Sequence, residues 1–187
     1  MFQMVDNYIY LYHIDKFIVL PTYPESITDS LGASFNETSP LSRSAPIFTY
    51  SHSGPRQIQV TLSLHRELMT QINYRVSNLN VELGDDYVDT MIKQLQAIAL
   101  PKYSVSTKMV NPPLVALRFG NEIFIKGVVN GGITLTYSGP ILNNNKYALV
   151  SISFTVTEVD PYDAESILSV GSFRGLNKTL ERNLYKS

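Results

Sequence analysis

The sequence contains no cysteine and carries almost no net charge, and each absence excludes a class of protein. Without cysteine, the 187-residue chain has no disulfide framework, no thiolate zinc site and no cysteine nucleophile. Its formal net charge of -1 provides no basic surface for binding nucleic acid or an anionic membrane. The same near-neutral charge leaves little repulsion between copies, which favours association with other subunits.

Long apolar segments are also missing. No run approaches the roughly 20 residues that a membrane helix needs, and residues 1–6 lack the basic and then apolar layout of a signal peptide. We therefore expect a protein that folds in a cytosol without membrane insertion. Hydrophobic residues make up 44% and charged residues 17% of the chain, enough apolar content for the full core of one domain.

The clearest structural signal lies between residues 113 and 163, where strands alternate with glycine and asparagine. Tyr147–Glu158 is predicted to be a long strand, because its side chains alternate between apolar residues and hydroxyls. Shorter strands are predicted before it, over Val115–Phe119, Glu122–Val129 and Ile133–Tyr137. The apolar face of the long strand holds Ala148, Val150, Ile152, Phe154 and Val156, whereas Ser151, Ser153, Thr155 and Thr157 hold the other.

Earlier parts of the chain add further strands and one amphipathic helix. Gln57–Leu64 alternates like the long strand, and short β-type runs occur over residues 8–13 and Lys16–Leu20. Asp86 is a good N-cap for a helix that Pro101 ends. Its predicted apolar stripe comprises Val88, Met91, Ile92, Leu95 and either Ile98 or Ala99.

The fold class follows as mainly β with one packed α-helix (α+β), built as an antiparallel barrel or sandwich. Residues 1–163 are predicted to form the domain, with a long loop over residues 25–56 that contains one short strand around Ile47–Tyr50. Residues 67–80 fit either a turn or a short helix. A C-terminal extension over residues 164–187 is expected to begin with a short helix and to continue as a polar, basic tail.

No residue pattern predicts a catalytic, cofactor or metal site. The histidines, His13, His52 and His65, lack the short spacing of metal ligands. Ser51-His52-Ser53 reads as a polar turn, because a catalytic triad is assembled in space and not from chain neighbours.

Two further clusters have simpler structural explanations. Helix capping accounts for Asp85, Asp86 and Asp89 without a metal. Gly127, Gly131 and Gly132 are not followed by the Gly-Lys-Ser/Thr of a phosphate loop, so we interpret them as a tight hairpin. Asn143-Asn144-Asn145 is likewise predicted to be a turn.

Two segments carry a resemblance to a known family. The first is Leu20-Pro21-Thr22-Tyr23-Pro24-Glu25, leading to Arg43-Ser44-Ala45-Pro46-Ile47 and Gly54-Pro55-Arg56. The second is Pro112-Pro113-Leu114-Val115, with Phe119-Gly120, Gly127-Val128-Val129, Thr136-Tyr137-Ser138-Gly139-Pro140-Ile141 and Thr157-Glu158-Val159-Asp160. Their order resembles baseplate proteins of contractile phage tails, in the tail-tube initiator or tube-to-hub adaptor group. Members often carry a LysM module, for which this chain lacks room after Glu158.

The resemblance implies a virion protein, assembled in the host cytoplasm, that connects the tail tube to the central hub or spike without catalysis. Its partners would be copies of itself in a hexameric ring, the tube, the hub and other baseplate proteins. One alternative is a wedge or connector protein outside the tube. A second is a ligand-binding β-sandwich such as a receptor-binding domain, with an aromatic cluster drawn from Tyr23, Phe35, Phe48 and Tyr50. A third, a cell-wall hydrolase, would need paired carboxylates close in space.

Overall fold

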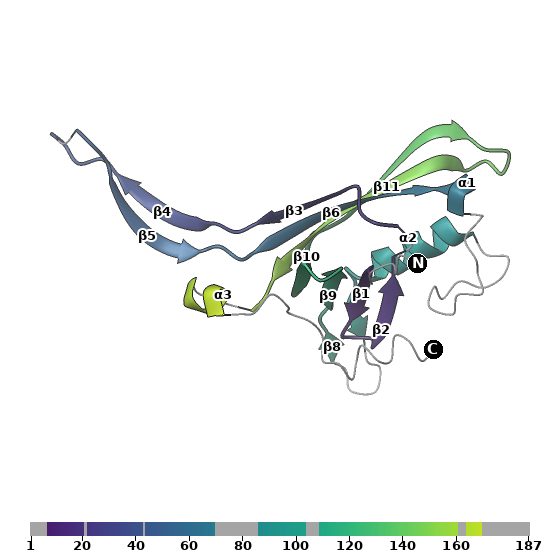
Figure 1. Cartoon of the computed structure of the whole chain (residues 1–187), viewed down its shortest axis with the longest axis horizontal. Coiled ribbons are helices and arrows are strands. Elements are labelled where there is room, and N and C mark those ends of the chain that lie inside the picture. Colours follow the sequence, from purple (N-terminus) through teal and green to yellow (C-terminus); the bar gives the residue numbers. More distant parts are fainter. Residues whose placement is uncertain are drawn as a thin grey trace.

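A computed structural model describes residues 7–20, 22–42, 44–69, 86–103, 109–160 and 164–169. In Figure 1 the molecule is elongated, with a central body and a narrow two-stranded projection at one end. The elements in chain order are β1 (Asn7–Leu11), β2 (Lys16–Val19), β3 (Ser26–Ser30), β4 (Ala33–Thr38), β5 (Ile47–Ser53), β6 (Gln57–His65), α1 (Arg66–Met69), α2 (Tyr87–Ala97), β7 (Lys102–Tyr103), β8 (Val110–Asn111), β9 (Leu114–Phe119), β10 (Ile123–Ile141), β11 (Tyr147–Glu158) and α3 (Ala164–Ser169).

The body is built on one antiparallel sheet of seven strands, in the order β2-β1-β9-β10-β11-β6-β3. Two further sheets have two strands each, β4 with β5 and β7 with β8. The mainly β, α+β class is therefore confirmed. The predicted closed barrel is wrong, because β2 and β3 end the sheet at opposite edges and do not pair with each other.

Alternation along β6 and β11 places their apolar side chains in one core. Ile58, Val60, Leu62 and Leu64 are fully buried, as the sequence predicts. Phe154 lies opposite Val60 and Ile152 opposite Leu62, so the two strands contribute paired layers to the same face. The hydroxyl-bearing residues of β11 are half-buried on the other face.

Helix α2 packs on the core face of this sheet. Asp86 caps it, since the carboxylate accepts from the backbone N–H groups of Val88 and Asp89 at 3.0 and 3.3 Å. The predicted apolar stripe is confirmed: Val88, Met91, Ile92, Leu95 and Ile98 are all buried in the main core cluster. Pro101 follows the helix end at Ala97 by four residues.

The glycines of β10 were predicted to make a hairpin turn, and the structure corrects this. Gly131 and Gly132 lie inside one 19-residue strand, with φ angles of +75° and +80°. Asn130 pairs with Thr155 and Ile133 pairs with Phe154, so the two glycines form a bulge without partners in β11. Because the bulge inserts two residues, the alternation of side chains between the two faces continues unchanged past it. Val129, Ile133 and Leu135 therefore all pack toward the core.

The predicted turn at residues 143–145 is confirmed between β10 and β11. Asn145 adopts a left-handed conformation with a φ of 59°, and its backbone N–H donates to the Leu142 carbonyl at 2.9 Å.

Residues 25–56, predicted to be a long loop with one short strand, instead form three strands, β3, β4 and β5. The short strand predicted around Ile47–Tyr50 is confirmed within β5. β3 pairs with β6 at the sheet edge, and the chain then continues into the two-stranded sheet of β4 and β5. We call β4 and β5 the arm; it projects from the body beyond β3 and β6 (Figure 1). Nearly all of its residues are exposed, as expected for two strands that have no second layer beneath them in the described structure.

The short helices α1 and α3 bear on the predictions for residues 67–80 and for the C-terminal extension. α1 includes residues 67–69 of the segment predicted to be a turn or a short helix, and α3 confirms the short helix at the start of the C-terminal extension. The predicted basic tail over 171–187 and residues 70–80 lie outside the described part of the chain.

Candidate interaction surfaces

The histidines do not assemble into a site. Within the described residues, no group of three or more His, Cys, Asp or Glu side chains is placed to hold a metal. His13 lies in the turn after β1, His65 ends β6, and His52 lies on the arm. Ser51-His52-Ser53 belongs to strand β5 and not to the predicted turn, and the Ser51 hydroxyl lies 3.2 Å from His52 Nδ1. Both side chains are exposed, so this contact is a local surface interaction.

Of the three aspartates ascribed to helix capping, Asp85 lies outside the described residues. Asp86 and Asp89 also form ion pairs with two cationic side chains, which the sequence did not predict. The buried Arg66 guanidinium donates to Asp86 at 2.6 Å and to Asp89 at 2.7 Å, and Lys146 bonds the same two carboxylates. Arg66 Nε also donates to the Tyr147 carbonyl at 2.9 Å. The group therefore ties α1, α2 and the β10–β11 turn together.

The ion pairs with Asp86, Arg66 and each other shift the pKa values of Asp89 and Lys146. Burial alone would raise the pKa of Asp89, but hydrogen bonds from Lys146 and Arg66 outweigh it and hold the pKa below its ordinary value. Hydrogen bonds to Asp86 and Asp89 raise the pKa of Lys146. Both shifts favour the charged forms of Asp89 and Lys146, which suits a structural ion-pair network better than proton transfer.

The arm presents one aromatic face and one polar face. Phe35 pairs with Tyr50 and Glu37 pairs with Phe48, so these four side chains share a face, while Asn36 and Thr49 lie on the other. The aromatic side chains are 56–62% exposed. Phe35 and Tyr50 meet edge to face, with ring centroids 5.7 Å apart. Among the described residues, neither ring belongs to a buried hydrophobic cluster. Exposed apolar surface of this kind marks interaction sites.

Unpaired strand edges form a second candidate surface. β2 and β3 each have one neighbour in the described sheet. β10 pairs with β9 only over Ile123–Val128, so its longer half, beyond the bulge, is bonded only to β11 in the described structure. Residues 133–138 of that half carry no charge. Such edges are templates for pairing with another chain.

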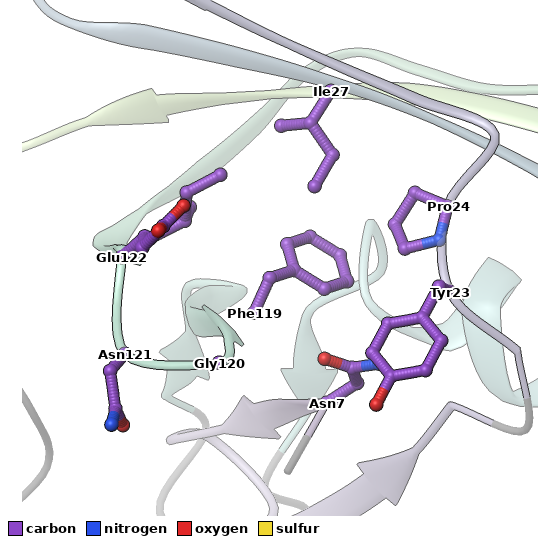
Figure 2. Close-up of a pocket in the computed structure, with 9 residues that line it drawn as sticks. Asn7, Tyr23, Pro24, Ile27, Phe119, Gly120, Asn121 and Glu122 are labelled. Atoms are coloured by element: carbon purple, nitrogen blue, oxygen red, sulfur yellow. The ribbon is translucent and has the colours of Figure 1, made fainter. Parts of the chain in front are cut away.

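A pocket opens where β1, β3 and the β9–β10 turn meet (Figure 2). It has a volume of about 460 Å³, within the range of sites that hold a small molecule or a few side chains. Arg118 holds the turn that forms one wall, by donating to the Gly120 carbonyl at 3.0 Å and the Asn121 amide oxygen at 3.1 Å. The lining comprises Asn7, Tyr23, Pro24, Ile27, Phe119, Gly120, Asn121, Glu122 and Ile123.

One polar group in this pocket is unsatisfied. Asn7 is only 7% exposed, and its Oδ1 has no hydrogen-bond partner among the described residues. Figure 2 shows its amide among the apolar side chains, with Phe119 and Tyr23 nearby. A buried acceptor without a partner is costly, so this position favours a donor from a bound group.

The aromatic set of the ligand-binding alternative does not form one site. Tyr23 lines the pocket, whereas Phe35, Phe48 and Tyr50 lie on the arm. The aromatic residues of the arm were visible in the sequence, but their common face depends on the β4–β5 register. The pocket was not predicted, because its walls come from three segments that lie far apart in the sequence.

Comparisons with known proteins add no family: no family model matches the chain, and no curated protein matches it. In the described part of the chain, every helix is too short or too polar to cross a membrane.

Proposed function

We propose that the protein is a structural component of a contractile phage tail baseplate, where it connects the tail tube to the central hub or spike. The proposal assigns it a tail-tube-like fold, a place in the virion after assembly in the host cytoplasm, and no catalytic role. It rests on the resemblance of the two segments quoted above, and on surfaces suited to assembly.

The observation that carries the proposal is an open sheet beside a projecting arm. In the described part of the chain, β2 and β3 each leave one edge unpaired, at opposite ends of the strand order. A head-to-tail ring pairs one edge with the other in the next copy and closes without leaving either free. The proposed mechanism is therefore strand addition between copies, with the arm reaching a further contact.

The near-neutral charge supports the same function, since copies with a formal net charge of -1 repel each other weakly. The partly exposed ion pairs among Arg66, Asp86, Asp89 and Lys146 tie α1, α2 and the β10–β11 turn together, which suits a subunit that must keep its shape in a ring. The described residues favour an enzyme less than a structural protein. The neighbouring carboxylates Asp86 and Asp89 are already bonded to the cationic side chains Arg66 and Lys146.

A cryo-electron microscopy map of the parent tail tests this proposal. The expected result is a ring of copies at the end of the tail tube, on its axis, in contact with the hub. Density for the chain outside the tube would overturn the adaptor role in favour of a wedge or connector. Absence of the chain from the tail would overturn the baseplate role itself.

A further inference from the structure

The pocket beside Asn7 and the aromatic face of the arm are complementary surfaces on one chain. We propose that the arm of one copy docks its aromatic face into the Asn7 pocket of a second copy. This inference rests on the self-association proposed above and names a contact that would join neighbouring copies.

The pocket calls for an occupant that is apolar over most of its surface and carries one donor. Its apolar lining includes Phe119, Ile27 and Ile123, and Asn7 Oδ1, on the same lining, has no hydrogen-bond partner among the described residues. A tyrosine meets both needs, because its ring is apolar and its hydroxyl donates.

The arm supplies this chemistry. Phe48 and Tyr50 are two residues apart on β5 and therefore point to the same face, where both are exposed. The Tyr50 hydroxyl lies 2.7 Å from Ser53 Oγ, and either oxygen can be the donor. When Ser53 donates, the Tyr50 proton is available for Asn7 Oδ1 while Phe48 fills the apolar part of the pocket.

An arm cannot reach the pocket of its own chain. Phe35 follows the pocket residue Ile27 by eight residues that run from β3 into β4, a length along the chain of about 26 Å at the usual strand rise. The root of the arm is held in place, because Gly54 N donates to the Gly32 carbonyl at 2.8 Å and Arg56 Nε donates to Asp29 at 2.9 Å. Figure 1 shows the arm directed away from the body.

The length of the arm fits a contact between neighbours. A compact body of about 100 residues has a radius of gyration of about 13 Å, hence a width near 30 Å. A reach of about 26 Å therefore spans roughly one subunit and brings the aromatic face to the equivalent pocket of the next copy. Such a contact joins different surfaces, so it generates a ring or a filament.

The absence of native cysteine permits an unambiguous cross-linking test. One full-length variant carries Glu37→Cys, on the aromatic face of the arm, and a second carries Glu122→Cys, at the pocket rim. The two are mixed and treated with a short bismaleimide. The matched control replaces the first variant by Asn36→Cys, which is equally exposed but lies on the polar face.

We expect the Glu37→Cys and Glu122→Cys pair to give a cross-linked dimer at several times the yield of the Asn36→Cys control. Adding Phe48→Ser to the Glu37→Cys chain should reduce the yield to that of the control. A single chain carrying both cysteines should form a ladder of multimers, because each copy offers one arm and one pocket.

Equal yields from the two arm positions, or no cross-linked dimer, would overturn the arm-to-pocket contact. That failure would leave the baseplate role standing, since sheet edges alone can join copies. Conversely, absence of the chain from the tail would overturn the baseplate role while a specific cross-link would still establish the contact.

Discussion

Strands β5 and β6 are separated by only three residues, yet they occupy opposite environments. All seven residues of β5 are exposed, whereas β6 buries every second side chain. The difference lies in what surrounds each strand. β6 pairs with both β11 and β3 above a core shared with α2, while β5 pairs with β4 alone. Alternation in a sequence therefore reports a core beneath a strand, and its absence does not exclude a strand.

The same comparison separates stability from interaction. An isolated two-stranded hairpin is at best marginally stable in water, so the arm depends on its root in the body and on any partner that covers it. The body holds the buried core and the ion pairs that fix its helices. Substitutions in the body should therefore affect folding, and substitutions on the arm should affect assembly.

The largest effect is expected from Phe154→Asp in the body. Phe154 is 3% exposed opposite Val60, so a carboxylate there is buried without a partner and should cost more than about 4 kcal/mol, enough to prevent folding. Thr155→Asp, on the half-buried outer face of β11, should cost about 1 kcal/mol or less. Circular dichroism during urea unfolding measures both. Equal losses of stability in the two variants would show that the core-facing and outward-facing residues of β11 are wrongly assigned.

Next in size is Gly127→Ala, where the backbone of β11 approaches closely. A Cβ at this position would lie 2.1 Å from the Thr157 carbonyl oxygen, so the strands must separate at a cost of about 3 kcal/mol. Gly32→Ala, at the root of the arm, meets no atom within 4 Å and should change stability by about 0.5 kcal/mol or less. Thermal unfolding compares the two, and a larger loss at Gly32 would contradict the assigned packing.

A smaller effect, dependent on pH, is expected at Asp89. Its pKa is lower in the fold than in the unfolded chain, so its stabilisation is present above about pH 4 and is lost as the pH falls through the folded value. Asp89→Asn should cost about 1 kcal/mol at neutral pH, because the side chain is 35% exposed and water screens its ion pairs.

The stability lost in Asp89→Asn should shrink as the pH falls below about 4. Urea unfolding of the wild type and of Asp89→Asn, repeated from acid to neutral pH, measures this. Glu165→Gln, on the exposed start of α3, is the control and should leave stability nearly unchanged. A constant difference between wild type and Asp89→Asn at every pH would exclude the ion pairs as its source.

The smallest effect on stability is expected from Phe48→Asp on the arm. Phe48 is 62% exposed, so the substitution should change the free energy of unfolding by about 0.5 kcal/mol or less. Its effect should appear in self-association, measured by sedimentation at several concentrations, with Thr49→Asp on the polar face as the control. Loss of folding in Phe48→Asp would mean that the arm packs on its own body.

The sequence predicts the body far better than the arm. Tyr147–Glu158 is found with the predicted bounds, and the Asp86 cap and its helix are found in place, because each has a local pattern enforced by the core. Residues 25–56 show no such pattern. Their strands depend on cross-strand pairing that only the fold supplies.

The candidate surfaces were predictable only in part, since they depend on contacts between distant residues. Arg66 meets Asp86 across 20 residues, and Lys146 meets it across 60. Gly131 and Gly132 both have positive φ angles, which suit a hairpin turn and a β-bulge equally well. Only the pairing of β10 with β11 shows that they form a bulge.

Hydrogen exchange read by mass spectrometry tests the division between body and arm most directly. In the isolated chain, amides of β6 should exchange slowly and those of β5 rapidly, because among the described residues β5 has one partner strand and no covering layer. In the proposed assembly of copies, β5 should become protected while β6 changes little. A β5 that is as protected as β6 in the isolated chain, or that stays unprotected after assembly, would contradict the account.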